Sequence, residues 1–449
     1  MEKSLDKGLD KSLEKREGFS SKMGFIISCI GAAIGLGNVW MFPYKLGENG
    51  GAAFLIPYFF FVVVLGLVGL MGEFSFGRMY KKGSLGAIRQ IFKEKNIKGG
   101  TIISIIPTLG LIGIFMFYTV VIGWVLKYFF ISLTGEISSI NTEAYFANFA
   151  NSPNVVFWHA LAVIITLIIV SFGVSKGIEQ INKIIIPLLF IIFFVLIFKS
   201  LSLPGSLNGV SYLLKPNWSD LLKPMTWVMA MGQAFFTVSI TGCCMVVCGS
   251  YADNQFDIPN CAINTAFFDT LAALLAGFMI MPAVFALGLN PTAGPALMFV
   301  TVPSIFQTMK FGSFLSALFF LSIIFASISS SIAMLEGPVE AVLGLTKWSR
   351  KKATLITATI AFIISIPLGL NGELFNNFTN FITIVLSPIG AVITAVVFYF
   401  IVNKKEALDG VNIGAKYKLG SWFITFGRYV FVPATIIIII LGIRYGGIG

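Results

Sequence analysis

Long hydrophobic runs, separated by charges, prolines and Asn/Gly clusters, divide the chain into about eleven apolar segments. A helix needs about 20 apolar residues to cross a hydrocarbon core of roughly 30 Å, and most of these runs reach that length. The pattern therefore predicts an all-α protein that crosses a membrane many times. The predicted spans cover residues 24–45, 52–72, 101–132, 155–173, 180–200, 223–249, 260–288, 312–344, 352–370, 375–402 and 419–443.

Composition supports the same class. Of the 449 residues, 57% are hydrophobic and only 11% are charged, whereas a soluble domain carries about 25% charged residues. An ordinary cytosolic enzyme and a nucleic-acid-binding module are therefore both excluded, despite a formal net charge of +11. The five cysteines lie in or beside apolar stretches and include no CxxC pair, so no disulfide framework is expected.

The distribution of positive charge predicts how the chain is oriented. If the N-terminus is cytoplasmic, about 23 of the 31 Lys and Arg residues lie in inner segments, and the outer segment 133–154 has none. We therefore expect a multi-pass protein of the plasma (inner) membrane with a cytoplasmic N-terminus. Eleven spans then place the C-terminus outside.

Two predicted spans contain residues that continue a helix poorly. Span 1 contains Gly31-Ala-Ala-Ile-Gly-Leu-Gly-Asn38, and span 6 contains Phe236-Thr-Val-Ser-Ile-Thr-Gly242. Unwinding within a membrane frees backbone groups that an ion or a polar solute can satisfy. The glycines of span 1 could instead serve close helix packing, but the matching break five spans later favours a binding site.

Spans 1–5 and 6–10 form two units of equal length, and an odd number of spans inverts the second unit relative to the first. Inverted repeats with paired broken helices are typical of secondary transporters. The expected organisation is a tail (1–18), a first repeat (19–200), a second repeat (201–402), and a loop with span 11 and a short outer tail (403–449).

Several motifs carry a resemblance to a known family. They are Gly31-Ala-Ala-Ile-Gly-Leu-Gly-Asn-Val-Trp-Met-Phe-Pro43 with Glu48-Asn-Gly-Gly-Ala-Ala-Phe54, Gly72-Glu-Phe-Ser-Phe-Gly-Arg78, Phe117-Tyr118 with Trp124, Gln233-Ala-Phe-Phe-Thr-Val-Ser239, and Ser329-Ser-Ser-Ile-Ala333. Together they resemble the neurotransmitter:sodium symporter family, from about residue 18 to 443. The resemblance implies a leucine-transporter-type fold with unwound spans 1 and 6.

The resemblance also implies two sodium sites. The first would use Ala33, Asn38, Thr237, Asp269 and the carboxylate of the substrate. The second would use Gly31, Ile34, Ala326, Ser329 and Ser330. Carbonyl, hydroxyl, amide and carboxylate oxygens are the ligands that a hard cation requires, so the chemistry agrees with the resemblance.

The family places its substrate between the two breaks. Its amino and carboxyl groups would meet the backbone around Gly35 to Gly37 and the hydroxyl of Tyr118, and Phe236 would cover the bound solute. The implied substrate-binding set comprises Ala32, Ala33, Gly35, Gly37, Ile114, Tyr118, Phe236, Thr237, Ser239, Gly242, Ser330 and Met334. Tyr118 and Phe236 could also be simple packing residues.

The substrate class follows from two departures from the family. Gly35 stands where monoamine carriers have Asp, so the solute should bring its own carboxylate, which favours an amino acid. Gly242 stands where the leucine-selective relative has Phe, which predicts more room for a side chain. Apolar walls with a few hydroxyl groups then suit a hydrophobic or aromatic L-amino acid.

A third departure concerns chloride. Ala273 occupies the position that resembles the chloride-contacting serine, whereas Asp269 supplies a buried carboxylate one turn earlier. We expect Asp269 to replace chloride, and to bind or release a proton as sodium leaves or enters. The alternative is that Asp269 is a protonated, structural hydrogen-bonding group.

The expected gates also depart from the family. At the outer gate Met41 replaces the usual arginine, and Lys45 could supply a cation one turn further out, while Tyr118 and Phe236 close over the substrate. At the inner gate Arg16 is retained, with Glu336 or Glu340 as possible partners.

The sequence as a whole predicts a Na⁺-coupled symporter that imports its substrate by alternating access, with two sodium ions and without chloride. The alternative is a solute-gated channel or a transceptor that binds an amino acid without concentrating it. The sequence shows no nucleophile paired with a base and no His/Cys metal cluster, so an enzyme is not indicated.

Overall fold

The computed structural model describes residues 17–291 and 297–445. Within these ranges every regular element is a helix. The predicted gate residue Arg16 lies outside the described residues.

Nine helices among the described residues are long and apolar enough to cross a membrane, and a bent pair makes a tenth. Two of the nine clearly extend the predicted spans: the helix predicted at 52–72 continues to Tyr80, and the helix predicted at 180–200 begins at Val174, because the π-helix η4 (Val174–Glu179) runs directly into Gln180. The nine are α4–α5 (Ala52–Phe61 and Leu67–Tyr80), α7 (Gly100–Leu133), α9 (Asn154–Ser171), α10 (Gln180–Leu201), α15 (Ile258–Ala286), α17 (Gly312–Leu345), α18 (Arg350–Leu370), α19–α20 (Gly372–Asn380 and Ser387–Val396) and α22–α23 (Trp422–Phe426 and Val432–Tyr445).

The bent pair is span 1. Helix α2 (Lys22–Ala33) stops, and the chain resumes as η1 (Gly37–Met41) and α3 (Phe42–Glu48) after a bend of 51°. Ile34, directly after α2, has extended backbone angles (φ −67°, ψ 115°), so the helical hydrogen-bond ladder cannot continue.

Span 6 is divided into two shorter helices, α13 (Pro224–Thr237) and α14 (Cys244–Ser250). Between them Ser239 and Gly242 adopt left-handed angles, with φ of 57° and 73°. Glycine reaches such angles without strain, whereas serine rarely does. Both breaks predicted from the sequence are therefore confirmed.

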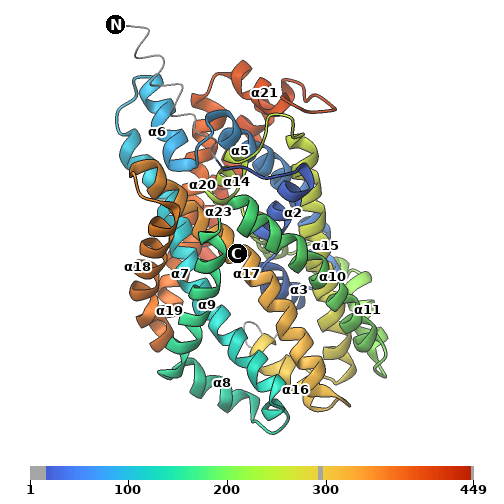
Figure 1. The fold of residues 1–449 in the computed structure, drawn as a ribbon. Helices are drawn as coiled ribbons and strands as arrows, with labels where there is room; N and C mark the ends of the chain where they lie inside the picture. Colours follow the sequence, from blue (N-terminus) through green and yellow to red (C-terminus); the bar gives the residue numbers. More distant parts are fainter. Residues whose placement is uncertain (1–16, 292–296, 446–449) are drawn as a thin grey trace, which may run out of the picture.

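The remaining helices lie at the two ends of the bundle. They are α6 (Ser84–Glu94), α8 (Thr142–Ala150), α11 (Ser206–Leu214), α12 (Trp218–Leu221), α16 (Val302–Gln307) and α21 (Lys404–Asn412). Figure 1 shows α6 and α21 at the upper end of the bundle and α8 and α16 at the opposite end.

Large hydrophobic side chains cover the outside of the bundle. Phe157, Ile184 and Phe198 are 65%, 60% and 73% exposed. Many exposed apolar side chains of this size would promote aggregation in water, whereas a hydrocarbon environment accommodates them.

The centre of the bundle is packed around α7 and α17, which run along one another, and α2 packs against α10, α15 and α17. The two breaks therefore lie in the interior, where protein rather than lipid surrounds the unwound backbone.

Candidate functional site

Side chains satisfy the backbone that the break in span 1 sets free. The Gly35 amide donates to Asn38 Oδ1 (2.9 Å), and the Leu36 amide donates to Tyr118 Oη (2.9 Å). The Gly37 carbonyl accepts from Gln233 Nε2 at 3.0 Å. Residues from α7 and α13 thus hold the unwound segment in one conformation.

Asn38 also joins three elements through its amide nitrogen. Nδ2 donates to Asp269 Oδ1 (2.7 Å), to the Asp269 carbonyl (2.9 Å) and to Thr237 Oγ1 (2.9 Å). Three of the four residues predicted for the first sodium site are therefore in direct contact. The fourth, Ala33, is the last residue of α2, so its carbonyl lies at the break.

This cluster contains buried oxygens without a partner. Asp269 is fully buried, and its Oδ2 has no hydrogen-bond partner among the described residues; the same is true of Tyr58 Oη and Gln233 Oε1. A buried carboxylate oxygen without a partner costs several kcal/mol. A sodium ion fits this set, because oxygens of this kind are the ligands of a hard cation.

A second group of oxygens lies on the other side of the break. Ser330 Oγ donates to the carbonyl of Ile34 (2.8 Å) and, more weakly, to that of Gly31 (3.4 Å). Ser329 Oγ donates to the Ala326 carbonyl at 2.8 Å, one turn earlier on α17. All five residues predicted for the second sodium site thus belong to the junction of α2 with α17.

A cavity of about 30 Å³ lies beside the two breaks, and ten of the twelve predicted substrate-binding residues line it. These ten are Ala33, Gly35, Gly37, Ile114, Tyr118, Phe236, Thr237, Ser239, Ser330 and Met334. Leu111, Thr241 and Cys244 also line it and were not predicted. Leu111 could have been found, because it lies three residues before Ile114 on the same face of α7.

The other two predicted residues lie behind the cavity wall. Ala32 is buried, and its carbonyl accepts from Ser239 Oγ at 3.1 Å. Gly242 faces the backbone of Gly390, and its amide donates to Glu73 Oε1 at 2.8 Å. The room that the sequence predicted at Gly242 is therefore taken up by α20 in this conformation.

At the predicted outer gate, Phe236 covers the first break: a Cβ on Gly37 would lie 3.3 Å from its ring. Met41, in η1, is only partly buried. Lys45 is 6% exposed, and its Nζ lies 3.8 Å from Met229 Sδ. Within the described ranges, Lys45 forms no salt bridge with a carboxylate.

At the opposite end, the structure brings Arg350, a residue that was not predicted, to the predicted inner gate. Glu336 accepts from Tyr251 Oη (2.6 Å) and pairs with Arg350 Nη2. Arg350 also contacts Glu17 through Nη1 (3.0 Å) and the Val170 carbonyl through Nε (3.0 Å). The sequence predicted Arg16 as the partner of Glu336 or Glu340; Arg16 lies outside the described residues, and among those described Arg350 pairs with Glu336.

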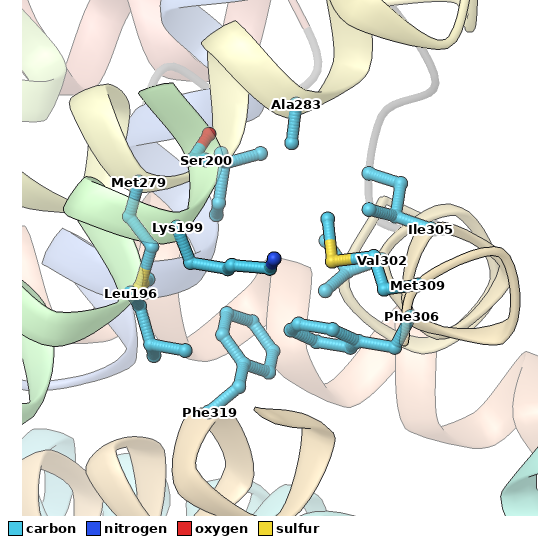
Figure 2. Close-up of a pocket in the computed structure, with 11 residues that line it drawn as sticks. Leu196, Lys199, Ser200, Met279, Ala283, Val302, Ile305, Phe306, Met309 and Phe319 are labelled. Atoms are coloured by element: carbon cyan, nitrogen blue, oxygen red, sulfur yellow. The ribbon is translucent and has the colours of Figure 1, made fainter. Parts of the chain in front are cut away.

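A separate cavity of about 20 Å³ lies between α10, α15, α16 and α17. Figure 2 shows the Lys199 side chain extending into it toward Phe306, Phe319 and Met309. An ammonium group among apolar side chains offers no ligand for a cation. The candidate site for sodium and substrate is therefore the central one.

The comparisons with known proteins agree with this geometry. The chain matches the Sodium:neurotransmitter symporter family over residues 16–151 and 147–445. It is 32% identical to a sodium-dependent transporter of Bacillus subtilis, over 96% of this chain and 98% of the relative. It is 28% identical to a bovine sodium- and chloride-dependent creatine transporter, over 80% of this chain and 66% of the relative.

Among solved structures, MhsT in complex with L-phenylalanine matches with a TM-score of 0.86 and 34% identity, covering 95% of this chain and 99% of that one. This match confirms the predicted fold. The chain therefore belongs to the sodium:neurotransmitter symporter family, and it is a sodium-dependent membrane transporter rather than an enzyme.

Proposed function

We propose that this transporter couples the entry of Na⁺ to the uptake of a hydrophobic or aromatic L-amino acid, by alternating access and without chloride. One observation carries the proposal: the buried oxygens of Asn38, Thr237 and Asp269 lie directly beside a cavity. Unwound backbone lines one part of this cavity, and apolar side chains line another. A cation in that cluster would attract the carboxylate of a solute in the cavity.

The lining of the cavity supports an α-amino acid as the solute. Polar groups occur at the breaks and at Tyr118, where they would meet the amino and carboxyl groups. Leu111, Ile114 and Met334 provide the apolar part of the wall. The similar transporter MhsT was solved with L-phenylalanine, which belongs to the same class.

The cavity must widen to admit such a side chain, because about 30 Å³ holds only a few water molecules. Met334 and Phe236 border it, and both are side chains that can change rotamer. We therefore propose that substrate entry displaces one or both of them.

We further propose two sodium ions, one at Asn38, Thr237 and Asp269 and one at Gly31, Ile34 and Ser330. Asp269 would supply the negative charge that chloride supplies in chloride-dependent relatives. A buried acid in a membrane protein is costly and therefore usually functional. Its orphaned Oδ2 supports a ligand role over a purely structural one.

The protein would lie in the plasma membrane with its N-terminus in the cytoplasm and its C-terminus outside. Arg350, Glu336 and Glu17 would then close the cytoplasmic end, and α2 would swing away when that end opens. Each positive charge that crosses a potential of 100 mV supplies about 2.3 kcal/mol, enough for more than tenfold accumulation.

Purified protein in proteoliposomes tests this proposal. Labelled phenylalanine or leucine should accumulate above the outside concentration when Na⁺ is higher outside, and unlabelled hydrophobic amino acids should compete. Replacing external Na⁺ by K⁺ should abolish accumulation, whereas replacing chloride by gluconate should not. Equilibration without accumulation would favour a channel or a transceptor, and no uptake of any of the twenty amino acids would reject the substrate class.

A further inference from the structure

A surface groove of about 840 Å³ lies between α6 and the last turns of α17. Helix α6 joins the end of one candidate span at Tyr80 to the start of the next at Gly100, so it lies where the chain turns between two membrane crossings. One face of α6 is apolar, and its side chains Ile88, Ile91 and Phe92 are buried. The groove borders the other, polar face of this helix.

Three cations line the groove on the α6 side. Arg89 and Lys93 lie four residues apart, and therefore on one face of α6, and Lys82 lies just before the helix begins. All three are exposed. Lys82 donates to Gln90 Oε1 at 2.8 Å, whereas Arg89 and Lys93 form no hydrogen bond or salt bridge within the described part of the chain. These two charges are available to a ligand.

Two acidic residues also line the groove, but both face groups of the protein. Glu94 accepts from Gln90 Nε2 at 2.8 Å. Glu340 is 8% exposed and faces the start of α6, because a Cβ on Gly83 would meet its Oε2. A carboxylate at a helix N-terminus is stabilised by the helix dipole. Over residues 81–98 six Lys and Arg residues stand against one acid, so the groove attracts an anion.

The α17 side of the groove supplies an apolar surface. Leu345 ends the span formed by α17, and it lines the groove with 54% of its surface exposed. An inorganic anion would leave this surface in contact with water. A phospholipid can place its phosphate at the cations and an acyl chain along Leu345. A basic groove at the ends of membrane spans is also the kind of site that binds anionic lipid headgroups.

We propose that an anionic phospholipid, phosphatidylglycerol or one of similar charge, binds in this groove. Its phosphate bridges Arg89 and Lys93, and one acyl chain lies along Leu345. In the orientation proposed above, this lipid belongs to the cytoplasmic leaflet of the membrane.

The lipid would join two elements that contact the transport machinery. Ser84, the first residue of α6, donates through its hydroxyl to the carbonyl of Gly242 at the break in span 6. In α17, Glu340 of the groove lies one turn after Glu336 of the inner gate. A ligand that holds α6 against α17 therefore stabilises the closed cytoplasmic end.

Native mass spectrometry tests the binding. Full-length protein is purified in detergent, freed of lipid, and titrated with phosphatidylglycerol or with phosphatidylcholine. Phosphatidylglycerol should bind more tightly, and Arg89→Gln combined with Lys93→Gln should raise the apparent Kd of the first bound molecule at least tenfold. The charge-retaining pair Arg89→Lys and Lys93→Arg should bind like the wild type.

Two controls separate this groove from general surface charge and from a site for free phosphate. Lys404→Gln combined with Lys405→Gln removes two exposed cations from α21, at the same end of the bundle, and should leave the Kd unchanged. Inorganic phosphate at the concentration of the lipid should not displace it. Equal weakening by the two double variants, equal binding of the two lipids, or displacement by phosphate would each overturn the proposal.

The effect on the cytoplasmic end is measured at Cys248, which lines a cavity of about 20 Å³ together with Glu336. In a background that keeps Cys248 as its only cysteine, phosphatidylglycerol should slow alkylation by a maleimide several-fold. It should not do so when Arg89→Gln and Lys93→Gln are added. Binding without slower alkylation would overturn the stabilising role. Both measurements are independent of uptake, so they decide this proposal whether or not the proposed substrate is correct.

Discussion

Asn38 Nδ2 lies 2.7 Å from Asp269 Oδ1, which ties the unwound part of span 1 to the middle of α15. Both side chains are fully buried. The Asn38 side chain also stabilises the break in span 1, because its Oδ1 accepts a hydrogen bond from the backbone N–H of Gly35. The oxygens proposed to bind sodium and the backbone proposed to bind the substrate are thus parts of one hydrogen-bonded unit. A substitution at either of them should therefore change the affinity of the other for its ligand.

Asp269→Asn should make uptake depend on chloride. The substitution keeps the size of the side chain and removes its negative charge, so a mobile anion has to replace that charge beside sodium. Initial uptake in gluconate medium should fall at least tenfold, and added chloride should restore part of it. The exposed Asp253→Asn serves as the control, and equal uptake by Asp269→Asn in both media would refute the role given to Asp269.

Ser330→Ala should weaken sodium binding more than substrate binding. It removes the hydroxyl that lies 2.8 Å from the Ile34 carbonyl. Loss of one such ligand costs about 1–2 kcal/mol, which raises the sodium concentration for half-maximal uptake roughly 5- to 30-fold. The neighbouring Ser331→Ala is a matched control, because Ser331 Oγ bonds the Ile328 carbonyl and Thr166 instead. A similar sodium dependence in the two variants would contradict the second site.

Gly35→Ala should abolish binding while leaving the protein folded. A Cβ at this position would lie 2.5 Å from Tyr118 Oη and 2.6 Å from Ser330 Oγ, so it would displace groups of both the proposed substrate site and the proposed second sodium site. We expect at least a tenfold loss of uptake with an unchanged elution volume in gel filtration. Gly344→Ala is the control, since a Cβ there meets open space, and normal uptake by Gly35→Ala would show that the cavity is not the binding site.

Arg350→Ala should open the cytoplasmic end more often. It removes the partner of Glu336, whose side chain is 4% exposed, as well as the contact with Glu17. The substitution is made in a background that keeps Cys248 as its only cysteine. Alkylation of Cys248 by a maleimide should be several-fold faster with Arg350→Ala than in the same background with Arg350 intact. Lys351→Ala, an exposed neighbour on α18, should not change the rate. An unchanged rate for Arg350→Ala would mean that this network does not close the cavity that Cys248 lines together with Tyr251 and Glu336.

The sequence was sufficient for the membrane spans and for both breaks, because glycines and hydroxyl residues inside an apolar run are a local signal. Ser329 and Ser330 also stand out in the sequence, because their hydroxyl groups interrupt the apolar run of α17. These features depend on residues that are neighbours along the chain, and the helical period relates them to one another.

Other features depend on how distant helices meet. Arg350 begins α18 but contacts Glu336 in α17, Glu17 before α2 and Val170 in α9. These residues lie far apart in the sequence, so no periodicity along the chain could have predicted that they meet. Gly242 aligns with a pocket position of the family, yet its left-handed backbone turns it toward Gly390. Lys45 could have faced water, but α3 packs against α15, and the Lys45 side chain is buried with its Nζ beside Met229 of α13.

The central claim is that sodium and a hydrophobic amino acid occupy adjoining parts of one site. Equilibrium binding of labelled phenylalanine and leucine to purified protein, measured over a series of Na⁺ concentrations at constant ionic strength with K⁺, tests this most directly. We predict that the apparent Kd for at least one of them falls at least tenfold as Na⁺ replaces K⁺, and that Asn38→Ala removes this dependence. Binding with the same Kd in Na⁺ and in K⁺ would contradict the account.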